Sequence, residues 1–255
     1  MVKKLLFIGV FLGGYSSICI GQNLNFFGII PSISQTGRIS NRFNYNLFAS
    51  EVLDLFDETI DNRYYPSKPL QLYIQPSLIY VHTPNLNFAV SLTYNYQRNN
   101  PDIPYNKEWR PWQQVVYAHN VYSGRMSHRL RFEERFIKNE TTGNWPLGTR
   151  LRYQIGFSVP LQGRTLEAKE CYFNCYNESY LTLTVPKGTT RSALYSEDWI
   201  YVGIGYQTTS LGRVEIGPLL QFNVRNVQHD LRNLYLLQLS WITNFEVPRK
   251  QDFTN

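Results

Sequence analysis

The chain has 255 residues, a formal net charge of +6 and an aromatic content of 15%. Its charged fraction of 17% is below the roughly 25% that is typical of soluble domains, and no run of 18 apolar residues predicts a helical membrane span. Nucleic-acid binding is disfavoured, because the basic residues lie within predicted strands instead of forming an exposed stripe.

Residues 1–21 have the pattern of a secretory signal peptide. Lys3 and Lys4 form a positive region ahead of an apolar run, and Gln22 is the expected first residue of the mature chain. We expect residues 22–255 to form a single domain with a net charge of +4, from 23 basic and 19 acidic residues.

Most of the remaining chain alternates apolar and polar residues with a period of two, which places successive side chains on opposite faces of a strand. Between residues 87 and 97, Phe88 and Leu92 share one face while Ala89 and Thr93 share the other. Eleven segments show this pattern: 24–34, 38–50, 70–82, 86–98, 112–122, 127–137, 149–161, 178–186, 198–208, 212–224 and 232–246. Because bacterial single-chain barrels usually have an even number of strands, the pattern predicts an all-β fold, an antiparallel transmembrane β-barrel of about 12 strands.

The connections alternate between short turns and longer links, as they do in outer-membrane barrels. Many segments reach 11–13 residues, whereas a tilted membrane strand needs about 9–11 and a globular strand about 5–6. We therefore expect the protein in the outer membrane of a Gram-negative bacterium, in contact with outer-membrane lipid, inserted by the barrel-assembly machinery and without a cofactor. A soluble secreted barrel of the lipocalin type is an alternative, since it alternates with its apolar face inside.

Charged residues on the polar faces indicate which face points inward. Arg129, Arg131 and Arg135 share one face of segment 127–137, and each would cost about 2–4 kcal/mol if it faced lipid at the membrane midplane. The predicted lumenal charge cluster is Arg42, Arg129, Arg131, Glu133, Arg135, Arg150, Arg152, Arg213 and Glu215. Either these residues brace a narrow interior through arginine–carboxylate pairs, or the excess of arginine forms an anion-attracting pore or binding cavity.

The segment 51–61 is acidic and contains no basic residue. Its apolar residues recur at helical spacing, which favours a surface loop with one helical turn. Alternatively, the loop folds inward as a gate, and four acidic residues would then meet the lumenal arginines: Asp54, Asp57, Glu58 and Asp61.

Two residue types carry further structural predictions. Trp109, Trp112 and Trp241 are predicted to anchor the barrel at the membrane interfaces, where tryptophan is enriched. Cys171 and Cys175 are predicted to form a small disulfide loop in an oxidising compartment. Two thiols without nearby partners are too few ligands for zinc, so we predict no metal site.

Candidate catalytic residues are sparse. A rim-located lipase or lipid deacylase needs a serine that a histidine activates, and the local group that the sequence offers is Ser127, His128 and Glu134. Ser127 and His128 are adjacent in a predicted strand, so their side chains point to opposite faces. The sequence therefore predicts a non-enzymatic barrel, either a narrow pore or carrier for small anionic solutes or a structural envelope component, with a lipid-modifying enzyme as the alternative.

Three blocks of sequence resemble those of a known family. Residues 108–114 read E-W-R-P-W-Q-Q, residues 129–136 read R-L-R-F-E-E-R-F, and residues 150–153 read R-L-R-Y. In their order and spacing these blocks resemble the domain-of-unknown-function 2490 family of predicted outer-membrane β-barrels. The resemblance implies the barrel architecture and the outer-membrane location. It implies no activity, because none is established for the family.

Overall fold

The structure of the protein is a computed structural model that describes residues 23–60, 63–98, 105–188, 193–224 and 230–244. The predicted signal peptide and Asp61 lie outside these residues. Among the described residues, eleven strands form one barrel: β1 (Asn23–Arg38), β2 (Phe43–Asp54), β5 (Pro69–Thr83), β6 (Leu86–Gln97), β7 (Asn106–Val121), β8 (Gly124–Ile137), β9 (Leu147–Pro160), β10 (Cys171–Thr184), β11 (Tyr195–Gln207), β12 (Arg213–Val224) and β13 (Leu231–Thr243). Two short strands, β3 (Glu58–Ile60) and β4 (Arg63–Tyr65), pair as a separate hairpin. Within the described ranges, no helix is long and apolar enough to cross a membrane.

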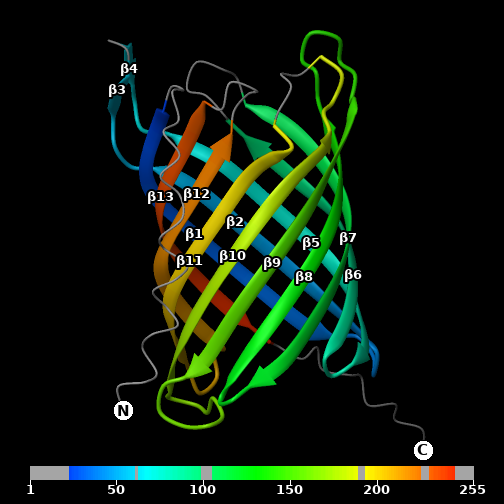
Figure 1. Ribbon diagram of the computed structural model, residues 1–255, viewed down its shortest axis with the longest axis vertical. Helices are drawn as coiled ribbons and strands as arrows, with labels where there is room; N and C mark the ends of the chain where they lie inside the picture. The colour runs from blue at the N-terminus through cyan, green and yellow to red at the C-terminus, as the bar shows by residue number, and fades with distance from the viewer. Residues whose placement is uncertain (1–22, 61–62, 99–104, 189–192, 225–229, 245–255) are drawn as a thin grey trace, which may run out of the picture.

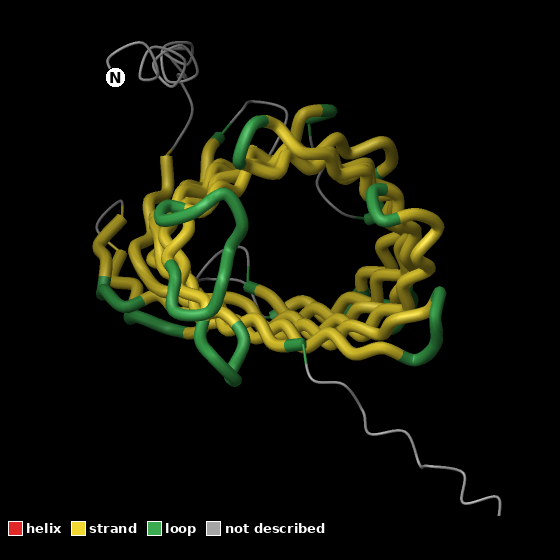
Figure 2. Tube along the Cα trace, turned by 90° about the horizontal axis from the view of Figure 1, so that it is seen from below, coloured by secondary structure: helices red, strands yellow, loops and turns green. Residues whose placement is uncertain are grey.

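The barrel is closed (Figure 1) and has an oval outline when viewed along its axis (Figure 2). Successive barrel strands are neighbours in the sheet and alternate in direction. Because their number in the described chain is odd, the first and last strands run the same way, and β1 pairs with β13 in parallel. The prediction of a closed all-β barrel is confirmed. The eleven segments read from the sequence overlap the eleven strands of the described residues, against the expected number of about 12, and all neighbouring pairs except β1–β13 are antiparallel.

The two ends of the barrel differ in the length of their connections. At one end, which we call the turn end, links of two to five residues join four hairpins: 39–42, 84–85, 122–123 and 208–212. A longer link, 161–170, lies at the same end. At the opposite end, which we call the loop end, the links are 55–68, 98–105, 138–146, 185–194 and 225–230. The β3–β4 hairpin belongs to the first of these and extends beyond the rim (Figure 1). We call the adjoining parts of the barrel the turn half and the loop half.

The side chains have an inside-out distribution. On β6, Phe88, Val90 and Leu92 are 43%, 51% and 52% exposed on the outer face, whereas Thr93 and Asn95 are fully buried inside. Apolar side chains are also exposed on other strands, including Leu72, Leu78, Leu130, Ile155, Val202, Ile204, Ile216 and Leu239. The outer face of the barrel is therefore apolar, in the orientation that the arginine-bearing segments predict.

Aromatic side chains lie on the outer face near both ends of the strands. Near the loop end, the rings of Tyr94 and Trp109 are 5.0 Å apart. Near the turn end, the rings of Phe43 and Tyr80 are 5.3 Å apart. The exterior thus has an aliphatic middle with aromatic side chains toward each border.

The interior of the loop half is filled from two sides. An apolar cluster packs inward mainly from β13, β1 and β2, and its buried members are Leu24, Phe26, Ile30, Val52, Leu70, Tyr201, Leu219, Leu234 and Leu236. The opposite wall, formed by β7 to β10, carries buried charged residues instead. The loop half therefore combines an apolar wall with a charged wall.

The predicted disulfide between Cys171 and Cys175 is wrong. β10 begins at Cys171 instead of near residue 178, so both cysteines belong to the strand and point to the same face, and both are free thiols. Four residues of extended strand span about 13 Å, whereas the Cα atoms of a disulfide lie about 4.4–6.8 Å apart.

Candidate functional site

The inward faces of β7 to β11 bring together oppositely charged residues in the loop half. Alternation along a strand sends every second side chain inside, which places Glu108 and Arg110 of β7 beside Arg131 and Glu133 of β8. Ten residues form this cluster, which we call the ionic network: Glu108, Arg110, Arg129, Arg131, Glu133, Arg135, Arg150, Arg152, Glu178 and Glu197.

Glu133 is the centre of the network and has no solvent exposure. Arg150 donates to its Oε2 from Nε and Nη2 at 2.8 and 2.6 Å, and Arg152 donates to its Oε1 from Nη1 at 2.7 Å. The Nη1 atoms of Arg110 and Arg131 lie 3.9 and 3.8 Å from the same carboxylate. Guanidinium groups from β7, β8 and β9 therefore surround one buried carboxylate.

Glu108 forms the second node of the network, next to the loop end. Its carboxylate accepts two hydrogen bonds from Arg110, at 2.8 and 3.0 Å, and two from Arg135, at 2.7 and 3.0 Å. The Nδ2 atom of Asn95 donates to the same carboxylate at 3.2 Å. Because paired bonds from planar guanidinium groups are strong and directional, Glu108 ties β6, β7 and β8 together.

Glu178 forms the third node, on β10. Arg152 donates to both of its carboxylate oxygens at 2.8 Å, and Arg129 donates from Nη2 to Oε1 at 2.7 Å. The Tyr180 hydroxyl donates to Oε2 at 3.2 Å, and the Tyr180 ring lies 4.4 Å from the guanidinium carbon of Arg152. Arg152 thus joins Glu178 to Glu133, so the nodes form one continuous network.

Arg131 is held by amide oxygens and an indole ring. Its Nε and Nη2 donate to Oε1 of Gln114 at 2.9 and 2.7 Å, and its Nη1 donates to Oε1 of Gln75 at 3.2 Å. Its guanidinium carbon lies 3.9 Å from the Trp112 ring centroid, and the Trp112 indole donates to Thr93 at 3.0 Å. The bond to Gln75 reaches from β8 to β5, three positions along the barrel wall, so it crosses part of the interior.

The network carries a net positive charge. Its six arginines and four glutamates give 6 − 4 = +2. An ion removed from water costs several kcal/mol unless its partners compensate, and a buried pair that loses one partner becomes strongly destabilising. The carboxylates are therefore needed to keep the buried arginines in place.

Six of the nine predicted lumenal charges belong to the network: Arg129, Arg131, Glu133, Arg135, Arg150 and Arg152. Arg213 and Glu215 also face inward, but they lie in the turn half and away from it. There, Glu215 accepts a hydrogen bond from Asn174 at 3.0 Å, and the guanidinium carbon of Arg213 is 5.8 Å from the Tyr172 ring centroid.

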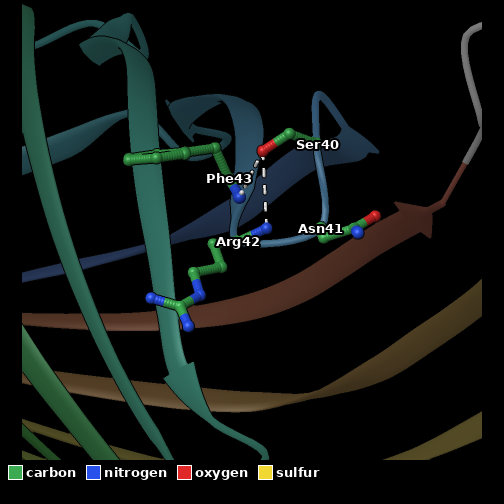
Figure 3. Close-up of a pocket in the computed structure, with 4 residues that line it drawn as sticks. All are labelled: Ser40, Asn41, Arg42 and Phe43. Atoms are coloured by element: carbon green, nitrogen blue, oxygen red, sulfur yellow. Dashed lines mark hydrogen bonds between the residues drawn. The ribbon is translucent and has the colours of Figure 1, made fainter.

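Arg42, the remaining predicted lumenal residue, does not face the interior. It is exposed in the 39–42 turn, and its Nη1 lies 3.4 Å from the hydroxyl of Tyr80, which is on the outer face. Figure 3 shows this turn, in which the Ser40 hydroxyl oxygen accepts the backbone N–H groups of Arg42 and Phe43 at 3.4 and 3.2 Å. Because β2 starts at Phe43 and not at residue 38, strand alternation does not apply to Arg42.

The acidic segment after β2 contains no helical turn among its described residues, and Asp57 and Glu58 do not fold into the barrel as a gate. Asp54 ends β2 and is buried, whereas Asp57 and Glu58 belong to the β-hairpin beyond the loop end (Figure 1). The Asp57 carboxylate accepts the Tyr64 hydroxyl at 2.6 Å and the Ser67 backbone N–H at 2.7 Å. The Ser67 bond, followed by the Tyr64 bond, lowers the pKa of Asp57 below its ordinary value. The hairpin thus satisfies Asp57 locally, without lumenal arginines.

The tryptophans separate into two groups. Trp109 and Trp241 are 42% and 39% exposed on the outer face, whereas Trp112 is 1% exposed inside the barrel. The prediction of Trp112 as an interface anchor is wrong, because β7 begins at Asn106 instead of residue 112. Alternation from Asn106 places Trp112 inward.

Sequence reasoning missed four members of the network: Glu108, Arg110, Glu178 and Glu197. Glu108, Arg110 and Trp112 are each two residues apart, so they share one face of a strand that begins at residue 106. A strand that begins at residue 112 does not include Glu108 or Arg110. The sequence pattern puts Glu178 at the start of a strand and Glu197 just before one, where a face is hard to assign; the observed strands begin at Cys171 and Tyr195.

Ser127 and His128 do not form a catalytic pair. Ser127 faces inward, whereas Nδ1 of His128 lies 2.8 Å from the Tyr153 hydroxyl on the outer face. The His128 ring stacks on His119 at a centroid distance of 5.7 Å. In the part of the chain that the structure describes, no group of three or more histidine, cysteine or acidic side chains is arranged to hold a metal ion.

The fold and the site define a class of protein: a closed β-barrel with an apolar exterior and an ionic network inside. A family model described as protein of unknown function (DUF2490) matches residues 32–232, and the chain belongs to this family. The family assignment from the three sequence blocks is therefore confirmed. No curated protein and no solved structure matches the chain.

Proposed function

We propose that the protein is a non-enzymatic barrel of the bacterial outer membrane whose interior is closed in the loop half. The observation that carries this proposal is the inside-out distribution of side chains. Leu92 is 52% exposed outside, while Arg131 and Arg152 are 3% and 6% exposed inside. A soluble lipocalin-like barrel would have the reverse arrangement, with apolar side chains in its core and charged side chains in water.

The strand dimensions also support a membrane location. The barrel strands have 12 to 16 residues, and a tilted strand needs about 9–11 to span a bilayer. An aliphatic band with aromatic borders is typical of the exterior of such barrels. By the same comparison, the loop end would face the outside medium and the turn end the periplasm.

A closed interior follows from how the loop half is filled. Glu108 and Trp112 are 1% exposed and Glu133 is not exposed, although all three point into the barrel. The apolar cluster fills the facing wall, and the Arg131–Gln75 bond links separated strands. Such packing favours a structural envelope component over an open pore, because a small barrel filled by side chains leaves no wide channel.

Two measurements test the two parts of this proposal. In membrane fractionation, we expect the full chain to stay in the pellet after carbonate extraction and to need detergent for release. Recovery as a soluble protein would contradict the membrane location. In planar bilayers, we expect no stable conductance of the size given by general porins. A large, steady channel would contradict the closed interior and leave the membrane location standing.

A narrow pore or carrier for small anions is a second candidate. It is favoured by the net charge of +2 in the network, with Arg129 retaining 23% side-chain exposure inside the barrel. A ring of positive charge selects anions. Small currents that reverse at the chloride equilibrium potential would support this candidate, and currents that follow the potassium potential would contradict it.

A further inference from the structure

Many small polar residues of the turn half are partly exposed although they face the interior, whereas Tyr172 and Glu215 of the same half are 3% and 6% exposed. Serine, asparagine, glutamine and glycine line much of this half, and many of them are half-buried although they face the interior: Ser32, Ser77, Asn87, Ser91, Ser127, Gln154, Gly156, Asn174, Gln238 and Ser240. Partial exposure of an inward side chain means that water reaches it. The network therefore separates a packed half from a hydrated one.

Arg129 lies at this boundary. The Arg129 side chain is 23% exposed, whereas the side chain of Arg131, two residues nearer the loop end on β8, is 4% exposed. Its Nη2 donates to Glu178 at 2.7 Å, while its Nε is buried and has no hydrogen-bond partner among the described residues. A buried guanidinium donor without an acceptor is costly, and the exposed part of Arg129 lies on the other atoms of its side chain.

The charge around Arg129 also favours an added anion. Glu178 is shared with Arg152, which forms two bonds to it, and the donors of Arg131 are occupied by uncharged amide oxygens. Arg129 and Arg131 therefore share their nearest carboxylates, Glu178 and Glu133, with Arg152. Both project from β8, two residues apart, and so point to the same face.

Neutral donors lie next to Arg129 on the same inner surface. Gln154 of β9 is its register partner, and Ser127 is two residues away on β8. Gly156 lets the Ser127 hydroxyl lie close against β9, since a Cβ atom at Gly156 would be 3.0 Å from that oxygen. Guanidinium, amide and hydroxyl donors are the groups that bind a small oxyanion.

We infer that the hydrated turn half holds a binding site for a small phosphate-type oxyanion, formed by Arg129 with Gln154 and Ser127. This inference deepens the anion-carrier candidate and rests on it for its biological meaning, but the binding itself does not require a membrane. A planar guanidinium fork matches two oxygens of a phosphate group. The bound anion would neutralise part of the excess charge at the edge of the network.

The test is calorimetric titration of inorganic phosphate into the full-length, detergent-purified protein. Gln154→Glu places a permanent carboxylate beside Arg129, and Arg129→Gln removes the guanidinium. The loss of one charge-assisted contact predicts about tenfold or greater weakening of phosphate binding in each variant. Arg125→Gln is the matched control, because Arg125 is an exposed arginine of the same strand at the turn end. We expect wild-type affinity in this control.

Gln154→Glu keeps the inference testable if Arg129→Gln destabilises the barrel, because the added carboxylate leaves every arginine of the network in place. Absence of phosphate binding to the wild-type protein would overturn the inference, and so would equal binding by wild type and Gln154→Glu. Loss of binding in Arg125→Gln alone would assign the phosphate to the exposed rim. None of these outcomes bears on membrane fractionation, so the failure of this site and the failure of the proposed location are distinguishable.

Discussion

The loop half and the turn half of the barrel share the same strands and the same apolar exterior, yet their interiors differ. In the loop half, Trp112, Glu133 and Tyr180 point inward and are 0–1% exposed. In the turn half, small polar residues such as Ser127 and Asn174 point inward and remain half-buried. Period-two alternation decides which face is inside, but the size and charge of the inward residues decide whether that inside is packed.

The interior of the loop half is filled in two physically different ways. The apolar cluster is held by the ordinary burial of side chains such as Phe26 and Leu234. The ionic network is held by mutual charge compensation, so each member depends on the others. We therefore expect large losses of stability from single changes in the network and small losses from single changes in the turn half.

The largest effect is expected for Glu133→Gln. The change leaves Arg150 and Arg152 buried without their shared carboxylate, and breaking a buried ion pair by removing one partner costs about 3–5 kcal/mol. The free energy of unfolding should fall by this amount in urea titrations of the micelle-bound protein. Ser127→Ala in the turn half is the control, with an expected change within about 0.5 kcal/mol. Equal losses in both variants would remove the distinction between the halves.

A smaller loss is expected for Arg131→Met. Methionine can still pack on the Trp112 ring, but the Gln114 side-chain oxygen loses its donor, and an unsatisfied buried acceptor costs about 1–3 kcal/mol. Oε1 of Gln75 loses one of its two donors and keeps the hydrogen bond from the Tyr73 hydroxyl at 2.9 Å. Removal of one positive charge from a network of net +2 offsets part of this cost. The same urea titration should therefore rank Arg131→Met below Glu133→Gln. The opposite rank would mean that amide and ring contacts contribute more than charge compensation does.

The sequence predicts the strands and the outer face of the barrel well, but it does not predict the contacts inside the ionic network. Alternation identified the eleven strands and the outward face of residues such as Leu92 and Ile155, because each outward residue depends only on its own strand. The partners of Arg152 depend on strand starts and on register between strands, which local patterns do not encode. The parallel closure of β1 on β13 likewise depends on the whole chain, since it follows from an odd number of strands.

The smallest expected effect concerns the β3–β4 hairpin, which lies outside both halves. The folded-state pKa of Asp57 is lowered by its bonds from Ser67 and Tyr64, so the stabilisation is present above the unfolded value of about 3.9 and is lost as pH falls through the lowered pKa. Hydrogen exchange within 55–68 should therefore accelerate at acidic pH while the barrel strands stay protected. Tyr64→Phe removes one of the bonds, and it should move this transition to higher pH. A hairpin transition that coincides with barrel unfolding would contradict its independence from the network.

The most direct test of the inside-out arrangement compares two tryptophans on one strand. Trp109 is 42% exposed on the outer face and Trp112 is 1% exposed inside. Two variants, each with one of these residues as its single tryptophan and phenylalanine at the other tryptophan positions, are reconstituted in bilayers that contain brominated phospholipid. Bromine quenches indole fluorescence on contact, so we expect strong quenching of Trp109 and little quenching of Trp112. Strong quenching of Trp112 with little effect on Trp109 would contradict the inside-out arrangement.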